Sequence, residues 1–236
     1  MNLLLISACF FGSFLFAPAS VSGAAPCSCS DIGTSISNVY EIDPTYGFGN
    51  SMLVYCDQQY DNGGWTVIQN RRDGSVKFLR GWDEYVRGFG DLRGEYWLGL
   101  EKIHQLTYSK TYQLAVVMED ASGAKAVARY SNFTVAGADN LYRLMSIGTY
   151  SGDAGDSLSD HLNFPFSTYD KDNDGYFGNC ASMYLGGWWY SACHKSNLNG
   201  LYMPGPRNEF ATMVCWNTWK GYYYGLKSVK MMIKPA

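Results

Sequence analysis

The hydrophobic residues of this chain gather in short runs separated by polar, glycine-containing stretches, a pattern typical of strands joined by turns. The first clear run is Gly64–Asn70. Two further runs, Leu114–Met118 and Ala126–Tyr130, predict strands connected by a turn at Ser122-Gly123. Near the C-terminus, Val229–Ile233 predicts a closing strand. These runs indicate a sheet built from short strands.

Short helices are expected in two places. One short helix is expected around Trp82–Val86. A second short helix is expected after Asp139, where three apolar residues lie at helical spacing: Leu141, Leu144 and Met145.

A tight turn is predicted at Asp73-Gly74, and it leads into Val76–Phe78.

From Ser151 onward the chain is rich in Gly, Asn, Asp and Ser and has little periodicity. Such a region needs support from something other than regular elements, and a cation and a disulfide are the obvious candidates. The run Asp170–Gly175 carries carboxylates at alternate positions, and hard oxygen donors in a flexible loop suit Ca²⁺. It matches the first half of an EF-hand loop, but the position of the closing Glu is Ala181. We therefore expect a calcium loop of another kind.

The N-terminus has the layout of a secretory signal peptide. Residues 3–16 are mostly apolar, fewer than the roughly 20 that a membrane helix needs, and small residues follow. We assign residues 1–23 to the signal peptide and residues 24–236 to a single domain. No later segment predicts a membrane span, so we expect a secreted, extracellular protein. The sequon at Asn132 predicts N-glycosylation on a surface loop.

The cysteines support an oxidising compartment. Cleavage of the signal peptide would remove Cys9 and leave six cysteines, an even number that favours disulfides over metal thiolates. Six cysteines permit fifteen connectivities, so spacing alone does not decide the pairing. Cys180 and Cys193 enclose a short loop, and a bond between them would stabilise the fold by roughly 3 kcal/mol in the chain-entropy model.

Charge and motif content exclude several classes of function. The formal net charge is −3 and the charges are interspersed, unlike the basic stripe of a nucleic-acid binder. The three histidines, His104, His161 and His194, are not accompanied by a G-x-S-x-G or HExxH motif, so we expect no enzyme. Aromatic residues make up 16% of the chain, and such side chains line sugar sites as well as cores.

A series of short motifs rich in aromatic residues, glycine and asparagine runs through most of the chain. In order they are Asp61–Val67, Arg71–Val76, Glu95–Gly99, Asp170–Cys180, Gly187–Tyr190, Cys193-His194 and Asn197–Tyr202. From about Cys29 to the C-terminus, the series resembles the fibrinogen-related domains of ficolins, tachylectins, angiopoietins and the fibrinogen gamma chain. The resemblance implies an α+β fold, with a twisted antiparallel sheet, short helices and an irregular calcium- and ligand-binding subdomain.

The resemblance also implies a calcium site. Its ligands would be the side chains of Asp172 and Asp174 and the backbone carbonyls of Tyr176 and Gly178. Asp170 would be the first calcium ligand if the run were an EF-hand loop, but in the family pattern it does not bind the ion directly. The family pattern and the bare spacing disagree at this residue, and we follow the family pattern.

Lectins similar to this chain bind acetyl groups in a pocket beside the calcium site. The resemblance places a cis peptide between Ala192 and Cys193, which would present a backbone amide to the acetyl oxygen. Phe210 stands where tachylectin-like members carry Tyr, so one hydroxyl is missing while the apolar wall is kept. Taken without the resemblance, these aromatics and the histidine would be interpreted as packed core residues. The implied walls are Tyr184, His194, Phe210, Ala211 and Tyr222.

The function implied is a secreted, calcium-dependent lectin that recognises N-acetylated carbohydrates of the N-acetylglucosamine type on microbial surfaces, in innate immune recognition or agglutination. The alternative is a protein-binding module that acts as a receptor ligand or in clotting-type assembly. The presence of Tyr184, His194 and Tyr222 at the pocket positions favours a sugar ligand over a protein ligand.

The resemblance further implies the disulfides Cys29–Cys56 and Cys180–Cys193. Cys27 and Cys215 would remain, either paired with each other or linking protomers. Since single sugar sites bind weakly, linked protomers would gain avidity, and a homo-oligomer is therefore expected as one possibility.

Overall fold

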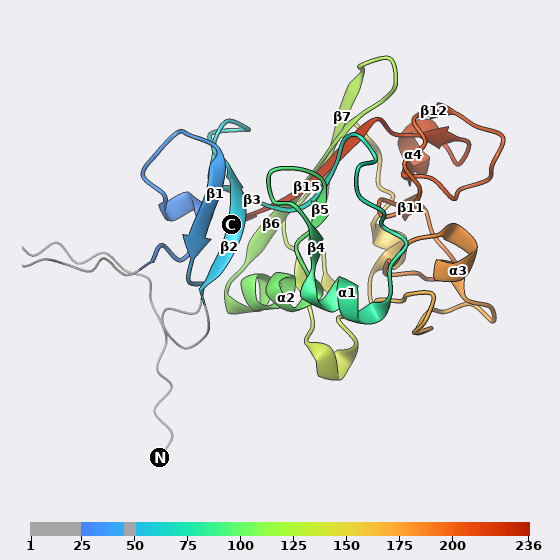
Figure 1. Ribbon diagram of the computed structural model, residues 1–236, viewed down its shortest axis with the longest axis horizontal. Helices are drawn as coiled ribbons and strands as arrows, with labels where there is room; N and C mark the ends of the chain where they lie inside the picture. The colour runs from blue at the N-terminus through green and yellow to red at the C-terminus, as the bar shows by residue number, and fades with distance from the viewer. Residues whose placement is uncertain (1–24, 45–50) are drawn as a thin grey trace, which may run out of the picture.

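A central antiparallel sheet forms the body of the computed structural model, which describes residues 25–44 and 51–236; the expected signal peptide lies outside them. The strands of this sheet are β1 (Asn38–Ile42), β2 (Met52–Asp57), β3 (Trp65–Arg71), β4 (Phe89–Gly90), β5 (Tyr96–Trp97), β6 (Tyr112–Glu119), β7 (Lys125–Tyr130), β10 (Tyr150–Gly152) and β15 (Ser228–Pro235). Their order is β1-β2-β3-β15-β6-β7-β10, and β5 pairs with both β3 and β4 (Figure 1).

The strand predictions from the sequence are confirmed, and β15 is the central strand. It pairs with β3 on one side and with β6 on the other, although these two strands lie far apart from it in the chain. Met231, Met232 and Ile233 are fully buried. The last strand of the chain therefore joins the two halves of the sheet.

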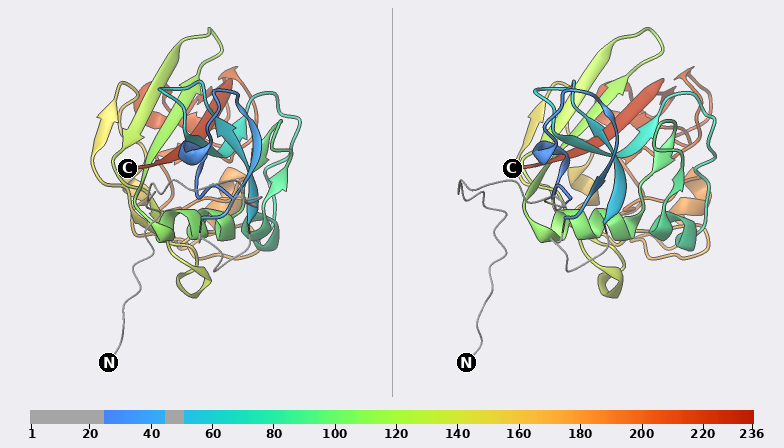
Figure 2. Two further views of the ribbon diagram at one scale, coloured as in Figure 1. Left: turned by 90° about the vertical axis from the view of Figure 1, so that its left-hand side faces the viewer. Right: turned by 60° about the vertical axis from the view of Figure 1, so that its left-hand side comes forward.

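Helices are short and lie beside the sheet. They are α1 (Trp82–Arg87), α2 (Leu100–Ser109), α3 (Cys180–Tyr184) and α4 (Asn217–Lys220), with 3-10 turns η1 (Cys29–Asp31), η2 (Ala138–Asn140) and η3 (Ser159–His161). The prediction of α1 is confirmed. Helix α2 was not predicted from the sequence, although Leu100, Ile103 and Leu106 recur at helical spacing and are fully buried. Helices α1 and α2 lie next to each other at one end of the sheet (Figure 2).

The helix predicted after Asp139 is wrong. The single turn η2 is followed by Leu141 and Tyr142 in left-handed conformations, with φ of 52° and 49°, which end a helix. Leu144 instead begins β9 (Leu144–Ser146), which pairs with β8 (Thr134–Val135). Burial of Leu144 in this pairing outweighs the local helical spacing.

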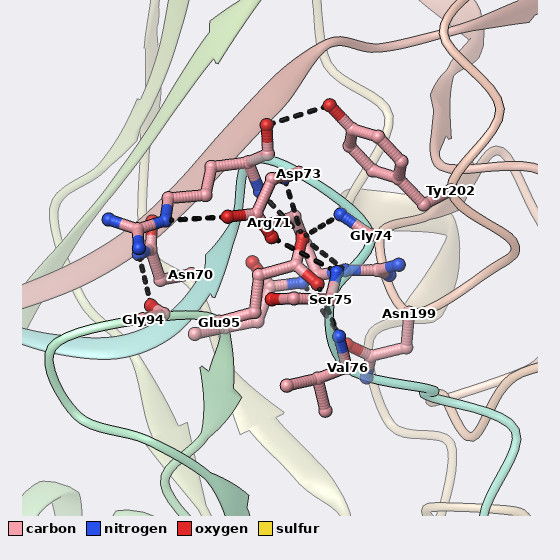
Figure 3. Close-up of polar contacts among 12 residues, drawn as sticks. Asn70, Arg71, Asp73, Gly74, Ser75, Val76, Gly94, Glu95, Asn199 and Tyr202 are labelled. Carbon is pink, nitrogen blue, oxygen red and sulfur yellow. Dashed lines mark hydrogen bonds and ion pairs between the residues drawn. The ribbon is translucent and has the colours of Figure 1, made fainter.

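The residues that follow the Asp73-Gly74 turn, Val76–Phe78, are not part of a strand. Backbone N–H groups of Arg72, Asp73, Gly74 and Val76 all donate to the Glu95 carboxylate, at 2.7, 3.1, 3.0 and 3.0 Å (Figure 3). Burial disfavours the charged carboxylate, but these hydrogen bonds outweigh it and lower the pKa of Glu95. The donors that a strand would use are thus committed to one buried anion.

An irregular subdomain follows β10, as expected, and lies along one side of the sheet (orange and red in Figure 1). Its regular pieces are the strand pairs β11 (Ser196–Asn197) with β13 (Cys215–Trp216) and β12 (Gly205–Pro206) with β14 (Tyr224–Gly225). Two side chains of β3 hold it to the sheet. Gln69 Nε2 donates to the Leu198 carbonyl at 2.8 Å, and Arg71 Nη1 donates to the Leu198 and Gly200 carbonyls at 3.1 and 2.9 Å.

The structure contains both disulfides that the resemblance implied, Cys29–Cys56 and Cys180–Cys193. It does not contain a bond between Cys27 and Cys215 within the described residues. Cys215 is fully buried, and burial raises the pKa of its thiol to about 12. A thiol without exposed surface cannot reach another chain, so neither role considered for Cys215 fits this fold.

Candidate functional site

The predicted calcium loop is ordered by its own carboxylates. Asp174 accepts hydrogen bonds from the backbone N–H groups of Tyr176 at 2.9 Å and Cys180 at 2.8 Å, one on each oxygen. Asp172 accepts a bond from the N–H of Asp174 at 3.3 Å. The two predicted carboxylate ligands therefore lie in the same turn, immediately before the Cys180–Cys193 disulfide.

The electrostatics of this turn fit a cation. Burial raises the pKa of Asp174, and the charge of Asp172 raises it further, because two close carboxylates repel each other. Among residues 25–44 and 51–236, no three His, Cys, Asp or Glu side chains gather as a metal site. A calcium ion here would therefore need oxygen ligands in addition to these two side chains, and the carbonyls of Tyr176 and Gly178 are the candidates.

Asp170 has a different role from its two neighbours. Its carboxylate accepts hydrogen bonds from the Trp82 N–H at 2.9 and 3.2 Å and from the Thr168 hydroxyl at 2.7 Å. The ammonium of Lys171 lies 4.0 Å from the centre of the Trp82 ring. Asp170 and Lys171 thus attach the loop to the start of α1.

The predicted pocket residues come together around His194. Its ring lies edge-on to Tyr184 at 4.5 Å between centroids and to Tyr222 at 5.9 Å. The Phe210 ring lies tilted against Tyr222 at 5.1 Å between centroids, and 47% of the Phe210 surface is exposed. Four segments of the chain therefore build one aromatic surface: the end of α3, the turn after Cys193, the loop that carries Phe210 and the loop that carries Tyr222.

Backbone hydrogen bonds fix these segments to one another. The Tyr222 hydroxyl donates to the His194 carbonyl at 3.0 Å, and the Ala211 N–H donates to the Tyr222 carbonyl at 2.9 Å. The Ala192–Cys193 peptide is cis, as the resemblance implied, and the Cys193 carbonyl accepts the Ser191 N–H at 2.8 Å. Ala211 adopts φ of 61°, a left-handed conformation that is uncommon for alanine.

His194 has unused hydrogen-bonding capacity. Both of its ring nitrogens are buried and have no hydrogen-bond partner within the described part of the chain, although the Ala211 backbone lies close enough to favour the protonated ring. Burial lowers the pKa of His194 to about 3, and the positive charge of a protonated His161 would lower it further. The imidazole is therefore neutral at pH 7, with one donor and one acceptor unpaired, and unpaired buried polar atoms are rare in native proteins.

Comparison with known proteins identifies the family. Residues 26–236 match the family described as fibrinogen beta and gamma chains, C-terminal globular domain. This chain belongs to that family. It is 45% identical over 216 residues to human fibrinogen C domain-containing protein 1, covering 88% of this chain and 46% of the relative. It is 48% identical over 185 residues to mouse angiopoietin-related protein 6, covering 78% and 40%.

Solved structures of the family share the fold of this fibrinogen-related domain. The fibrinogen-like globe domain of human ANGPTL2 has a TM-score of 0.85 at 45% identity and covers 89% of this chain and 99% of that domain. Lamprey fibrin D-dimer, solved with the peptide ligand Gly-His-Arg-Pro-amide, has a TM-score of 0.83 at 34% identity and covers 92% and 75%.

These relatives establish the family rather than the narrower ficolin and tachylectin group expected from the sequence. The chain spans about half the length of the curated relatives it matches. Within the described residues, no helix has the length and apolar character needed to traverse a bilayer.

Sequence reasoning missed one structural residue of the site, His161. It is fully buried, its Nδ1 lies 2.7 Å from the Trp189 carbonyl, and its Nε2 accepts the N–H groups of Lys195 at 3.3 Å and Ser196 at 3.2 Å. It thereby joins the segments on either side of Cys193. No local pattern marks this role, because the partners lie 28 to 35 residues away along the chain.

The predicted glycosylation site lies away from the pocket. Asn132 precedes β8 and is half-buried, and its Nδ2 donates to the Ser146 hydroxyl at 2.8 Å. N-glycosylation at Asn132 stays a prediction from the sequon.

Proposed function

We propose that this fibrinogen-related domain is a secreted, calcium-dependent lectin that binds N-acetylated glycans on microbial surfaces and serves in innate immune recognition and agglutination. The main support is His194, a neutral imidazole with two unpaired nitrogens, set between Tyr184 and Tyr222. An apolar aromatic surface with a few unused polar groups is suited to an acetyl group, which combines a methyl with a carbonyl and an N–H.

Calcium would act on this pocket through the loop that precedes it. Bound between Asp172 and Asp174, with the carbonyls of Tyr176 and Gly178, the ion would compensate the repulsion of the two carboxylates. The loop reaches the pocket directly, since the Gly175 N–H donates to the carbonyl of Ser191 at 2.9 Å. Ordering this loop supports the Ala192–Cys193 peptide without contact between ion and sugar.

The deciding experiment is retention of the purified protein on immobilised N-acetylglucosamine, with immobilised glucosamine as the control resin. We expect binding to the acetylated resin in calcium and release by a chelator. Tyr222→Ala should abolish retention, whereas Tyr169→Ala, which alters a half-exposed tyrosine outside the pocket, should not. Equal retention on both resins, or retention that a chelator does not affect, would reject the lectin proposal.

A second candidate function is recognition of a peptide. The similarity to lamprey fibrin D-dimer, which was solved with Gly-His-Arg-Pro-amide, favours it. In that case the same aromatic surface would bind a peptide of a protein partner. Titration with that peptide tests this alternative: micromolar binding that N-acetylglucosamine does not displace, together with no retention on the acetylated resin, would favour the protein-binding module.

A further inference from the structure

Asn197 of β11 connects two walls of the pocket. It is fully buried, and its Nδ2 donates to the Tyr184 carbonyl at 2.8 Å and lies 3.4 Å from the Ala211 carbonyl. Its Oδ1 lies 3.2 Å from the Tyr190 hydroxyl. Because both carbonyls are acceptors, only the amide nitrogen can face them, so the orientation of this side chain is determined.

Asn197 connects the backbones of these two walls directly. Tyr184 ends α3, while Ala211 belongs to the loop between β12 and β13. A single amide that binds the backbone of both sets the distance between them. We infer that Asn197 fixes the width of the acetyl pocket and thereby limits the size of the acyl group that the pocket admits. This inference rests on the proposed lectin function.

The surrounding sequence is adapted to this amide. A Cβ on Gly200 would lie 2.6 Å from Asn197 Nδ2 and 2.7 Å from the carbonyls of Thr212 and Met213. Only glycine leaves room for the amide at this point. The motif Asn197–Tyr202, noted in the sequence as a family resemblance, therefore contains both the connecting amide and the space that it needs.

Asn199 offers a matched comparison within the same motif. It is also fully buried, and its Nδ2 donates to the Gly187 carbonyl at 2.9 Å while its Oδ1 accepts Gln69 Nε2 at 3.1 Å. It holds the subdomain to the sheet, and its side chain makes its hydrogen bonds to Gln69 and Gly187 rather than to Tyr184 or Ala211. Loss of either amide should destabilise the fold, whereas only Asn197 should change selectivity.

The test compares Asn197→Asp with Asn199→Asp in the full mature chain with calcium present. Binding of N-acetylglucosamine and N-propionylglucosamine is measured by calorimetry, and thermal unfolding is followed in parallel. The carboxylate in Asn197→Asp repels the two wall carbonyls, so we expect at least a tenfold loss of N-acetylglucosamine affinity and a severalfold fall in the acetyl-to-propionyl affinity ratio. Asn199→Asp should unfold at lower temperature but keep the wild-type ratio.

The outcomes separate the two proposals. Wild-type protein that binds neither sugar overturns both the lectin function and this inference. Wild-type binding with an unchanged ratio in Asn197→Asp, or an equal fall in both variants, overturns the inference alone. If Asn197→Asp does not fold, Tyr190→Phe decides, since it keeps the ring and removes the hydroxyl beside Asn197 Oδ1. A fall in the acetyl-to-propionyl affinity ratio of Tyr190→Phe, smaller than the fall expected for Asn197→Asp, supports the inference. A ratio equal to that of the wild type rejects it.

Discussion

Two buried histidines in the irregular subdomain differ in how they use their ring nitrogens. His161 uses both ring nitrogens to join backbone segments around the pocket, whereas His194 leaves both of its nitrogens unpaired. Burial lowers the pKa of His161 to about 4 and that of His194 to about 3. Both side chains are thus neutral in the folded protein at physiological pH, and acid should act on the fold through them.

The expected pH dependence follows from these depressed pKa values. Above pH 6.5 neither the folded nor the unfolded chain protonates these histidines, and their contribution to stability is complete. As the pH falls toward 4, the unfolded chain takes up protons that the folded chain excludes, so the free energy of unfolding falls by about 3 kcal/mol for His161.

Urea denaturation at neutral pH and near pH 4.5 measures this effect. His161→Gln keeps a donor and an acceptor but gains no charge, so its free energy of unfolding should fall less between the two pH values than that of the wild type. An identical loss in both proteins would show that His161 does not contribute.

At the scale of elements, two loops are ordered by side-chain carboxylates that accept backbone hydrogen bonds, in place of the hydrogen bonding of a helix or strand. The loop after β3 is organised by Glu95, and the predicted calcium loop by Asp174. In both cases a carboxylate collects backbone N–H groups that no strand or helix satisfies. Carboxylate-centred loops depend strongly on one side chain, which makes them sensitive to single substitutions.

Glu95→Gln tests the first of these loops. An amide has only one acceptor oxygen and presents an NH₂ group to backbone donors, so we expect a loss of roughly 3 kcal/mol in the free energy of unfolding. Glu84→Gln, which alters a partly exposed ion pair with Arg80, should cost less than about 1 kcal/mol. Equal losses by chemical denaturation would mean that the buried carboxylate has no special role.

Substitution of two nearby aspartates, Asp172 and Asp170, tests the predicted calcium loop. Asp172→Asn removes one of the two ligand charges and should weaken calcium binding at least tenfold in calorimetric titration. Asp170→Asn should retain the affinity, since its side chain is engaged by the Trp82 N–H and an amide oxygen can still accept that bond. A larger loss of calcium affinity in Asp170→Asn than in Asp172→Asn would favour the EF-hand assignment, in which Asp170 is a ligand.

For the whole molecule, the burial of Cys215 bears on assembly. Its thiol is inside the subdomain with a pKa raised to about 12 by burial, so it is neither exposed nor ionised at neutral pH. We expect a thiol reagent to modify Cys215 only after denaturation. Cys215→Ser should leave the mass in solution, measured by light scattering, unchanged; a shift to a smaller species would show that Cys215 links protomers.

The sequence by itself determined the features that depend on local composition and spacing. Periodicity identified β3, β6, β7, β15 and α1, and the ordered motifs identified the family and its disulfides. Local spacing failed after Asp139, where a buried strand pairing replaced the expected helix. Nor did local spacing show that the Val76 N–H would donate to the Glu95 carboxylate.

Only the tertiary structure decided which polar groups meet. The pairing of His161 with Lys195 and Ser196, the bridging by Asn197 and the unpaired nitrogens of His194 depend on segments brought together by the fold. Hydrogen bonds between such segments depend on distance and angle in space, and neither quantity is encoded in residue type or spacing. The ordered motifs thus indicated the kind of molecule, and packing specified the chemistry of its candidate site.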